Sequence, residues 1–190
     1  MFKLNSQKGF TLIEALVATA IFVVVIAVGT GVFLTISRAQ HKAVSISETQ
    51  QDARFALEAM VKEVRMGTVD YQYYEDNNIN LGKGIGELAI QGSNQNYLVF
   101  RKNTSGQLEV AINPSYQKTP SNFQAMTRTD VKVEKLTFFV HPTYNPYQSE
   151  VEKKQPRVTI LLQAKVEDKK DPSKTAVIDL ETTVTSRMYK

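Results

Sequence analysis

The hydrophobic residues of this chain are concentrated near its start. From Phe10 to Ile36 a run of twenty-seven residues contains one ionisable side chain, Glu14. At a helical rise of about 1.5 Å per residue the run extends about 40 Å, more than the roughly 30 Å hydrocarbon thickness of a bilayer. Because lipid offers no hydrogen-bond partners to a backbone, a single crossing has to be helical. The pattern therefore predicts a transmembrane helix at residues 10–36.

The helical pattern continues past the apolar run, although its composition changes. No proline or glycine interrupts residues 37–66. Apolar residues recur at spacings of three and four, which is typical of a helix that buries one face. These residues are Ala53, Ala56, Leu57, Met60, Val61 and Val64. We expect one helix from about Phe10 to Met66, with an extramembrane, amphipathic part at residues 37–67.

Residues 68–190 form a head domain in which the apolar period changes to two, as in β-strands. Candidate strands are Tyr97–Arg101, Leu108–Ile112, Val131–Val140, Arg157–Val166 and Ala176–Met188. Asn103 to Gly106 is a link short enough for a hairpin. The predicted fold class is α+β, with an antiparallel sheet packed on the amphipathic half of the helix.

Residues 1–9, MFKLNSQKG, contain Lys3 and Lys8 and no acidic residue, which is typical of a cationic leader. A secretory signal has an apolar core of about 7 to 15 residues, and the run at residues 10–36 is much longer. Cleavage after the apolar core is therefore disfavoured. Hydropathy alone is also compatible with an ordinary uncleaved signal-anchor at residues 10–36.

Glu14 is an unusual residue in an apolar span. An unpaired carboxylate at the centre of a membrane helix costs roughly 2.5 to 3.5 kcal/mol on insertion scales, and less near the edge. One interpretation is that Glu14 lies at headgroup level and stabilises the helix N-terminus through the helix dipole. The other is that it pairs with a cation from a neighbouring chain. The residues alone leave both open.

The segment from Lys8 to Ala18, KGFTLIEALVA, resembles the N-terminal motif of type IV prepilins and type II secretion pseudopilins. The resemblance implies that a prepilin peptidase cuts between Gly9 and Phe10 and methylates the new amine of Phe10. It also implies that Glu14 neutralises the N-terminal amine of an adjacent subunit and so sets the axial position of each subunit. The expected fold is the pilin fold.

The resemblance also implies a location. The chain would be a single-pass protein of the cytoplasmic (inner) membrane, with its C-terminal domain outside the cytoplasm, incorporated into a pilus or pseudopilus. Charge does not decide the orientation, because Lys3 and Lys8 on one flank are balanced by Arg38 and Lys42 on the other.

Two further segments resemble J-type minor pseudopilins and related minor pilins. They are ARFALEAMVKEVR at residues 53–65 and ETTVTSRM at residues 181–188. Glu14 argues mildly against the large tip pseudopilin, which typically lacks this residue. The absence of cysteine departs from many major pilins, whose C-terminal loop is closed by a disulfide.

Composition argues against several other functions. The 190 residues include 23 Lys and Arg, 19 Asp and Glu, no Cys and two His, at positions 41 and 141. These features exclude disulfides and thiolate chemistry, and no catalytic motif is present, so we expect no enzyme and no small-molecule substrate. The basic residues are scattered among acids, which does not indicate nucleic-acid binding. Gly82 to Gly86 lacks the spacing of a phosphate-binding loop.

One segment matches part of a calcium-loop pattern. Asp76, Asn78, Asn80 and Glu87 stand at positions 1, 3, 5 and 12 of such a loop, where oxygen ligands are needed. Leu81 occupies the sixth position, which requires glycine. Calcium is therefore a possible cofactor, and a polar surface loop is the alternative.

Five tyrosines fall in two non-periodic clusters, at positions 71, 73 and 74 and at positions 144 and 147. Such clusters suit interfaces between subunits, and they equally suit loops packed on a sheet.

The predicted function is that of a minor pilin or pseudopilin, processed by prepilin peptidase and assembled with other pilin subunits in a tip or initiation complex. The alternative is a solitary membrane-anchored, extracytoplasmic binding domain whose helix is only a tether.

Overall fold

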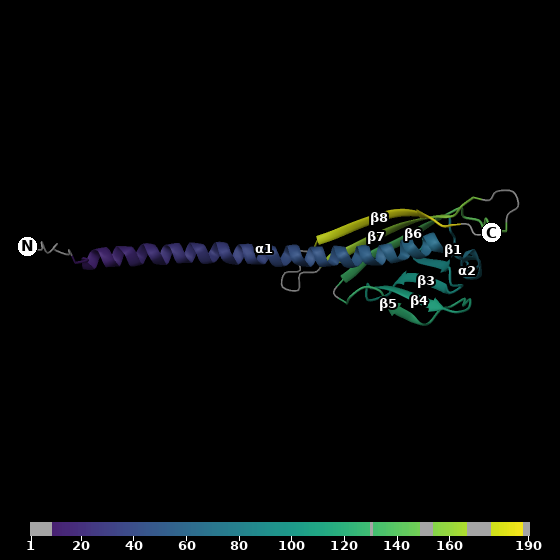
Figure 1. The fold of residues 1–190 in the computed structure, drawn as a ribbon, viewed down its shortest axis with the longest axis horizontal. Helices are drawn as coiled ribbons and strands as arrows, with labels where there is room; N and C mark the ends of the chain where they lie inside the picture. Colours follow the sequence, from purple (N-terminus) through teal and green to yellow (C-terminus); the bar gives the residue numbers. More distant parts are fainter. Residues whose placement is uncertain (1–8, 130, 149–153, 167–175, 188–190) are drawn as a thin grey trace, which may run out of the picture. The chain divides into compact units, whose positions relative to one another are not determined.

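The computed structural model describes residues 9–129, 131–148, 154–166 and 176–187 (Figure 1). The chain divides into two compact units, residues 1–44 and 45–190. Of the predicted leader, Gly9 is described and residues 1–8 lie outside the described part.

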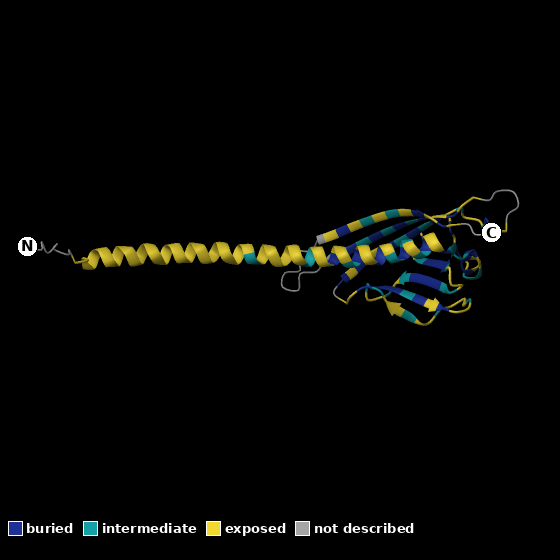
Figure 2. Cartoon of the chain, in the orientation of Figure 1, coloured by how far each residue is buried: buried dark blue, intermediate teal, exposed yellow. Residues whose placement is uncertain are grey.

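The first unit consists of the N-terminal part of helix α1, Leu12–Met66, which continues into the second unit. The predicted helix of residues 10–66 is confirmed to within two residues at its start. All residues from Phe10 to Ile36 are exposed (Figure 2). The first unit therefore has no apolar core of its own.

In its described residues the second unit combines the rest of α1 with eight strands and a short helix, which confirms the predicted α+β class. The elements after α1 are β1 Thr68–Val69, α2 Tyr71–Asp76, β2 Glu87–Gln91, β3 Tyr97–Lys102, β4 Leu108–Asn113, β5 Phe123–Ala125, β6 Val131–His141, β7 Arg157–Val166 and β8 Ala176–Thr185.

The strands form two antiparallel sheets, whereas the sequence pattern predicted one. One sheet has the order β1-β2-β3-β4-β5 and the other the order β6-β7-β8. Outside the named strands, Ile85 makes a β-bridge to Phe138 of β6, with its N–H 2.9 Å from the Phe138 carbonyl oxygen. Strands β1 and β5 were not predicted, because two and three residues are too few to show a period. Strand β2 was not predicted either, and its three central residues are buried in succession without alternation.

The predicted hairpin joins β3 and β4. The Asn103 N–H donates to the Gln107 carbonyl oxygen at 2.9 Å, and Gly106 closes the turn with a φ of 82°. A residue with a side chain rarely adopts this left-handed conformation, so glycine suits the position.

The core lies between the helix and the sheets. The buried face of α1 contributes Ala53, Ala56, Leu57, Met60 and Val64 to the same apolar cluster as Val158, Ile160, Leu162 and Ala164 of β7. Alternate residues of a strand point to opposite faces, so Thr159 and Leu161 lie on the outer face of this sheet, away from the core.

Candidate assembly site

The side chain of Thr11 caps the start of α1. The Glu14 N–H donates to Thr11 Oγ1 at 3.3 Å, and the Thr11 hydroxyl lies 3.5 Å from Glu14 Oε2. Thr11 is therefore the N-cap, and Glu14 occupies the third helical position. The sequence analysis did not identify Thr11 as a structural partner of Glu14, although the T-x-x-E spacing before an apolar run is a known signal for this arrangement.

The other hydroxyl groups of the apolar helix are satisfied within the helix. Thr19, Thr30 and Thr35 donate to the carbonyl oxygens four residues earlier, at 2.7, 2.8 and 2.9 Å. In a membrane such back-bonding removes the cost of a free hydroxyl. These threonines therefore do not require polar partners from outside.

Glu14 differs from these threonines because it carries a charge. Thr11 is its local partner, and none of the ion pairs within the described part of the chain involves Glu14. Neither Gly9 nor Phe10, the two residues of the predicted cleavage and methylation site, is covered by other residues. The arrangement leaves an accessible carboxylate on an exposed apolar helix, where a cation from another chain could reach it.

By length and composition α1 contains a stretch that could cross a membrane, and it is the one such helix among the described residues. No part of this stretch is buried by the rest of the chain, as it would be in the core helix of a globular domain.

The residues predicted to bind calcium have other contacts. Asp76 accepts a hydrogen bond from the Tyr116 hydroxyl, and Glu87 accepts one from the Tyr73 hydroxyl at 2.6 Å. Asn80 accepts from the N–H of Gly82 at 2.8 Å. Within the described residues no group of three or more His, Asp or Glu side chains could hold a metal ion.

Asn78 of the same set adopts a φ of 54° and is exposed. Glu87 begins strand β2, where it lies opposite Arg101 of β3, so a pairing within the sheet determines its position. Calcium binding remains a prediction, and it would have to compete with these tyrosine contacts.

The first tyrosine cluster packs into the core. Tyr71, Tyr73 and Tyr74 of α2 are buried, and the Tyr74 hydroxyl accepts the N–H of Ala89 at 2.8 Å. Burial raises the pKa of Tyr74, and burial together with the hydrogen bond to Glu87 raises the pKa of Tyr73. Both phenols stay neutral at physiological pH. For these three residues packing, and not an exposed interface, is the correct interpretation.

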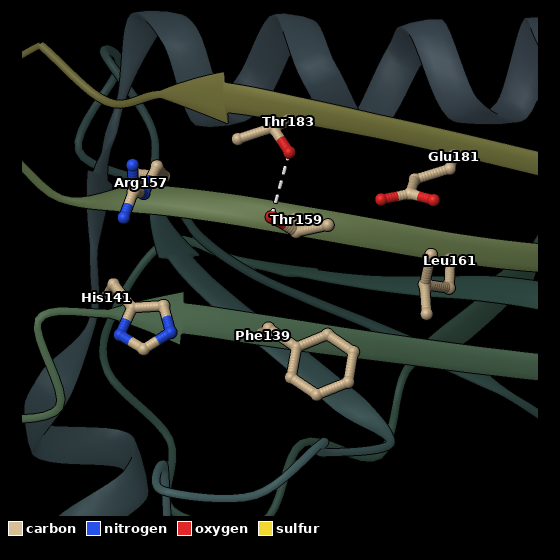
Figure 3. Close-up of a pocket in the computed structure, with 7 residues that line it drawn as sticks. All are labelled: Phe139, His141, Arg157, Thr159, Leu161, Glu181 and Thr183. Carbon is tan, nitrogen blue, oxygen red and sulfur yellow. Dashed lines mark hydrogen bonds between the residues drawn. The ribbon is translucent and has the colours of Figure 1, made fainter.

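Tyr144 and Tyr147 of the second cluster are exposed. Tyr144 lines a hollow that shares His141 and Arg157 with a second hollow, on the outer face of β6, β7 and β8. We call this second one the outer-face hollow (Figure 3). Its volume is about 450 Å³, and the residues that line it are Phe139, His141, Arg157, Thr159, Leu161, Glu181 and Thr183. Of the residues that the sequence analysis singled out, His141 lines it directly.

Comparison with known proteins identifies the N-terminal segment. Residues 4–30 match the family of the prokaryotic N-terminal methylation motif. The chain is 33% identical over 88 residues to the pilin-like protein PilA3 of Thermus thermophilus. The aligned part covers 46% of this chain and 37% of PilA3, so it spans little more than a third of that relative. No solved structure matches the chain.

The long helix followed by antiparallel sheets defines a pilin-like architecture. This architecture accompanies the methylation motif and the partial similarity to PilA3. The chain carries a prepilin-type methylation motif at its N-terminus and is similar over part of its length to a pilin-like protein. The motif and the apolar helix are consistent with a membrane-anchored subunit.

Proposed function

We propose that this chain is a minor pilin or pseudopilin of a type IV pilus or type II secretion pseudopilus. Prepilin peptidase cleaves it between Gly9 and Phe10 and methylates the Phe10 amine. The helix of residues 10–36 then packs laterally against those of other subunits in the tip or initiation complex. The head lies outside the cytoplasm. J-type minor pseudopilins are the subgroup that we propose for it.

The observation that supports this function most strongly is Glu14. It is an exposed carboxylate on an apolar helix, and no basic side chain pairs with it in the described part of the chain. A charge in lipid is tolerated when it acquires a partner of opposite charge. The ammonium group of a neighbouring Phe10 supplies such a partner and would fix the axial position of the incoming subunit.

Replacement of Glu14 by Leu tests the proposal. Removing one partner of a buried ion pair is strongly destabilising, so we expect the amount of subunit in the sheared filament fraction to fall by at least about tenfold. Glu75→Leu is the matched control, because Glu75 is an exposed carboxylate on α2 of the head. It should leave incorporation unchanged.

Mass spectrometry of the mature N-terminus accompanies this experiment. N-methyl-Phe10 in both variants would show that the loss is in assembly and not in processing. Normal incorporation of the Glu14→Leu protein would overturn the assembly role of Glu14. Absence of the parent protein from the filament fraction, or unchanged filament initiation in the Glu14→Leu strain, would favour the alternative, a solitary domain tethered by its helix.

A further inference from the structure

The outer-face hollow combines an apolar floor with charges at its two ends (Figure 3). Phe139 and Leu161 form the floor. His141 and Arg157 lie opposite each other on β6 and β7 at one end, and Glu181 of β8 lies opposite Leu161 at the other. None of the described hydrogen bonds or ion pairs neutralises Arg157 or Glu181.

The exposed face of α1 carries a complementary set of side chains. Phe55 is 67% exposed although it lies in the half of α1 that packs on the head. Arg54 precedes it and Glu58 follows one helical turn later, and both are exposed. In the part of the chain that the structure describes, neither charged residue belongs to an ion pair. A large apolar side chain is thus flanked by a cation and an anion.

The two surfaces lie on opposite sides of the core. The buried residues of α1 and β7 share one apolar cluster, so Phe55 points away from it on the helix side and Leu161 points away from it on the sheet side. A subunit with two different contact surfaces makes heterologous contacts, and contacts of this kind that do not close into a ring generate a filament.

We propose that the outer-face hollow binds the Phe55 face of α1 from a second copy of this chain. Phe55 covers Phe139 and Leu161, Glu58 pairs with Arg157 beside His141, and Arg54 approaches Glu181. The inference rests on the proposed function and deepens it, because it predicts that two copies are adjacent in the assembly.

Charge complementarity selects this occupant. The signs match in one orientation of the helix along the strands, and the reverse orientation would place Arg54 against Arg157 and Glu58 against Glu181. Four residues span about 13 Å along a strand and about 6 Å along a helix, and the long arginine side chains cover the difference. An aromatic side chain in an apolar hollow with flanking charges is typical of the centre of a protein interface.

Cysteine cross-linking tests the contact, because the chain contains no native cysteine. The full-length protein with Phe55→Cys and Leu161→Cys is oxidised in the membrane of cells that assemble the filament. We expect a disulfide-linked dimer of this chain, joined between positions 55 and 161. The matched control pairs Phe55→Cys with Ile112→Cys on the other sheet, where residue 112 is 52% exposed, and it should give at least fivefold less dimer.

Charge reversal then tests the predicted orientation. In the cross-linking background, Glu58→Arg or Arg157→Glu alone should reduce the dimer at least threefold, and the two together should restore it. Lys135→Glu reverses an exposed cation elsewhere on β6 and should have no effect. Failure of the double variant to restore the dimer would overturn the pairing.

Other outcomes remain distinguishable. A disulfide adduct with a different protein would overturn the second copy as the occupant. Absence of the dimer in cells whose filaments contain the subunit would overturn the docking contact and leave the proposed function intact. If the Glu14→Leu protein loses the dimer and is no longer incorporated, while the parent protein shows the dimer and is incorporated, the docking contact and the proposed function are both supported.

Discussion

The residues before Ser45 and those from Ser45 onward both contain long apolar stretches, but only the second group covers them with its own side chains (Figure 2). In the first unit the helix satisfies its polar groups locally, through back-bonded threonines and the Thr11 cap. In the second unit apolar residues from α1 and both sheets share one cluster. The first unit therefore depends on lipid or other subunits, whereas the second can supply its own stability.

A pair of phenylalanine substitutions should show the largest difference between the units. Phe138 is 0% exposed and Phe33 is 69% exposed. Phe138→Ala should lower the free energy of unfolding of the head by about 3 to 5 kcal/mol, because it removes buried surface and leaves a cavity. Phe33→Ala should leave it unchanged. Thermal unfolding of the detergent-solubilised protein, followed by near-ultraviolet circular dichroism, measures both, and equal effects would contradict the comparison.

Two glycine substitutions should show an effect on head stability of intermediate size, again in the second unit and not in the first. A Cβ at Gly67 would lie 2.5 Å from the Gln91 carbonyl oxygen and 2.9 Å from that of Glu63, whereas a Cβ at Gly29 would meet nothing within 4 Å. Gly67→Ala should destabilise the head by about 1 to 3 kcal/mol through this clash with the backbone. Gly29→Ala should not alter head unfolding in the same assay. An unchanged melting temperature for the Gly67 variant would show that the backbone at Gly67 can move away from Gln91 and Glu63 without cost.

The smallest expected effect concerns the first turn of α1. Thr11→Ala removes the acceptor for the Glu14 N–H and should cost about 1 kcal/mol locally, whereas Thr11→Ser should retain the cap. Amide hydrogen exchange at Glu14 in micelles should therefore quicken roughly fivefold in the Ala variant, with no change in the head. Equal exchange in both variants would show that the cap does not stabilise this turn.

Long periodic segments were predictable from the sequence. Strand β7 has the predicted bounds, Arg157–Val166, and α1 ends at Met66 as predicted. Their hydrophobic periodicity is a strong signal, because it repeats over many residues that alternate between a buried and an exposed face. Strand β8 ends at Thr185, short of the predicted Met188, which lies outside the described residues.

The loop chemistry was harder to predict. The spacing of Asp76 and Glu87 matches a calcium loop, but each carboxylate accepts a hydrogen bond from a tyrosine, and one of these tyrosines is forty residues away in sequence. No local pattern contains that pairing. Tyr71, Tyr73 and Tyr74 look like interface residues in sequence and are buried, because α2 packs them into the core.

The sequence by itself determined the parts of this protein that depend on local periodicity and solvent preference: the apolar helix, the position of Glu14 within it, the amphipathic continuation and the long strands. Only the tertiary structure decided how the strands divide into two sheets, which tyrosines are buried and which faces stay open. The physical reason is that a short strand or a loop carboxylate obtains its partners from distant residues. Its structure is therefore settled by the packing of the whole head and not by its neighbours in sequence.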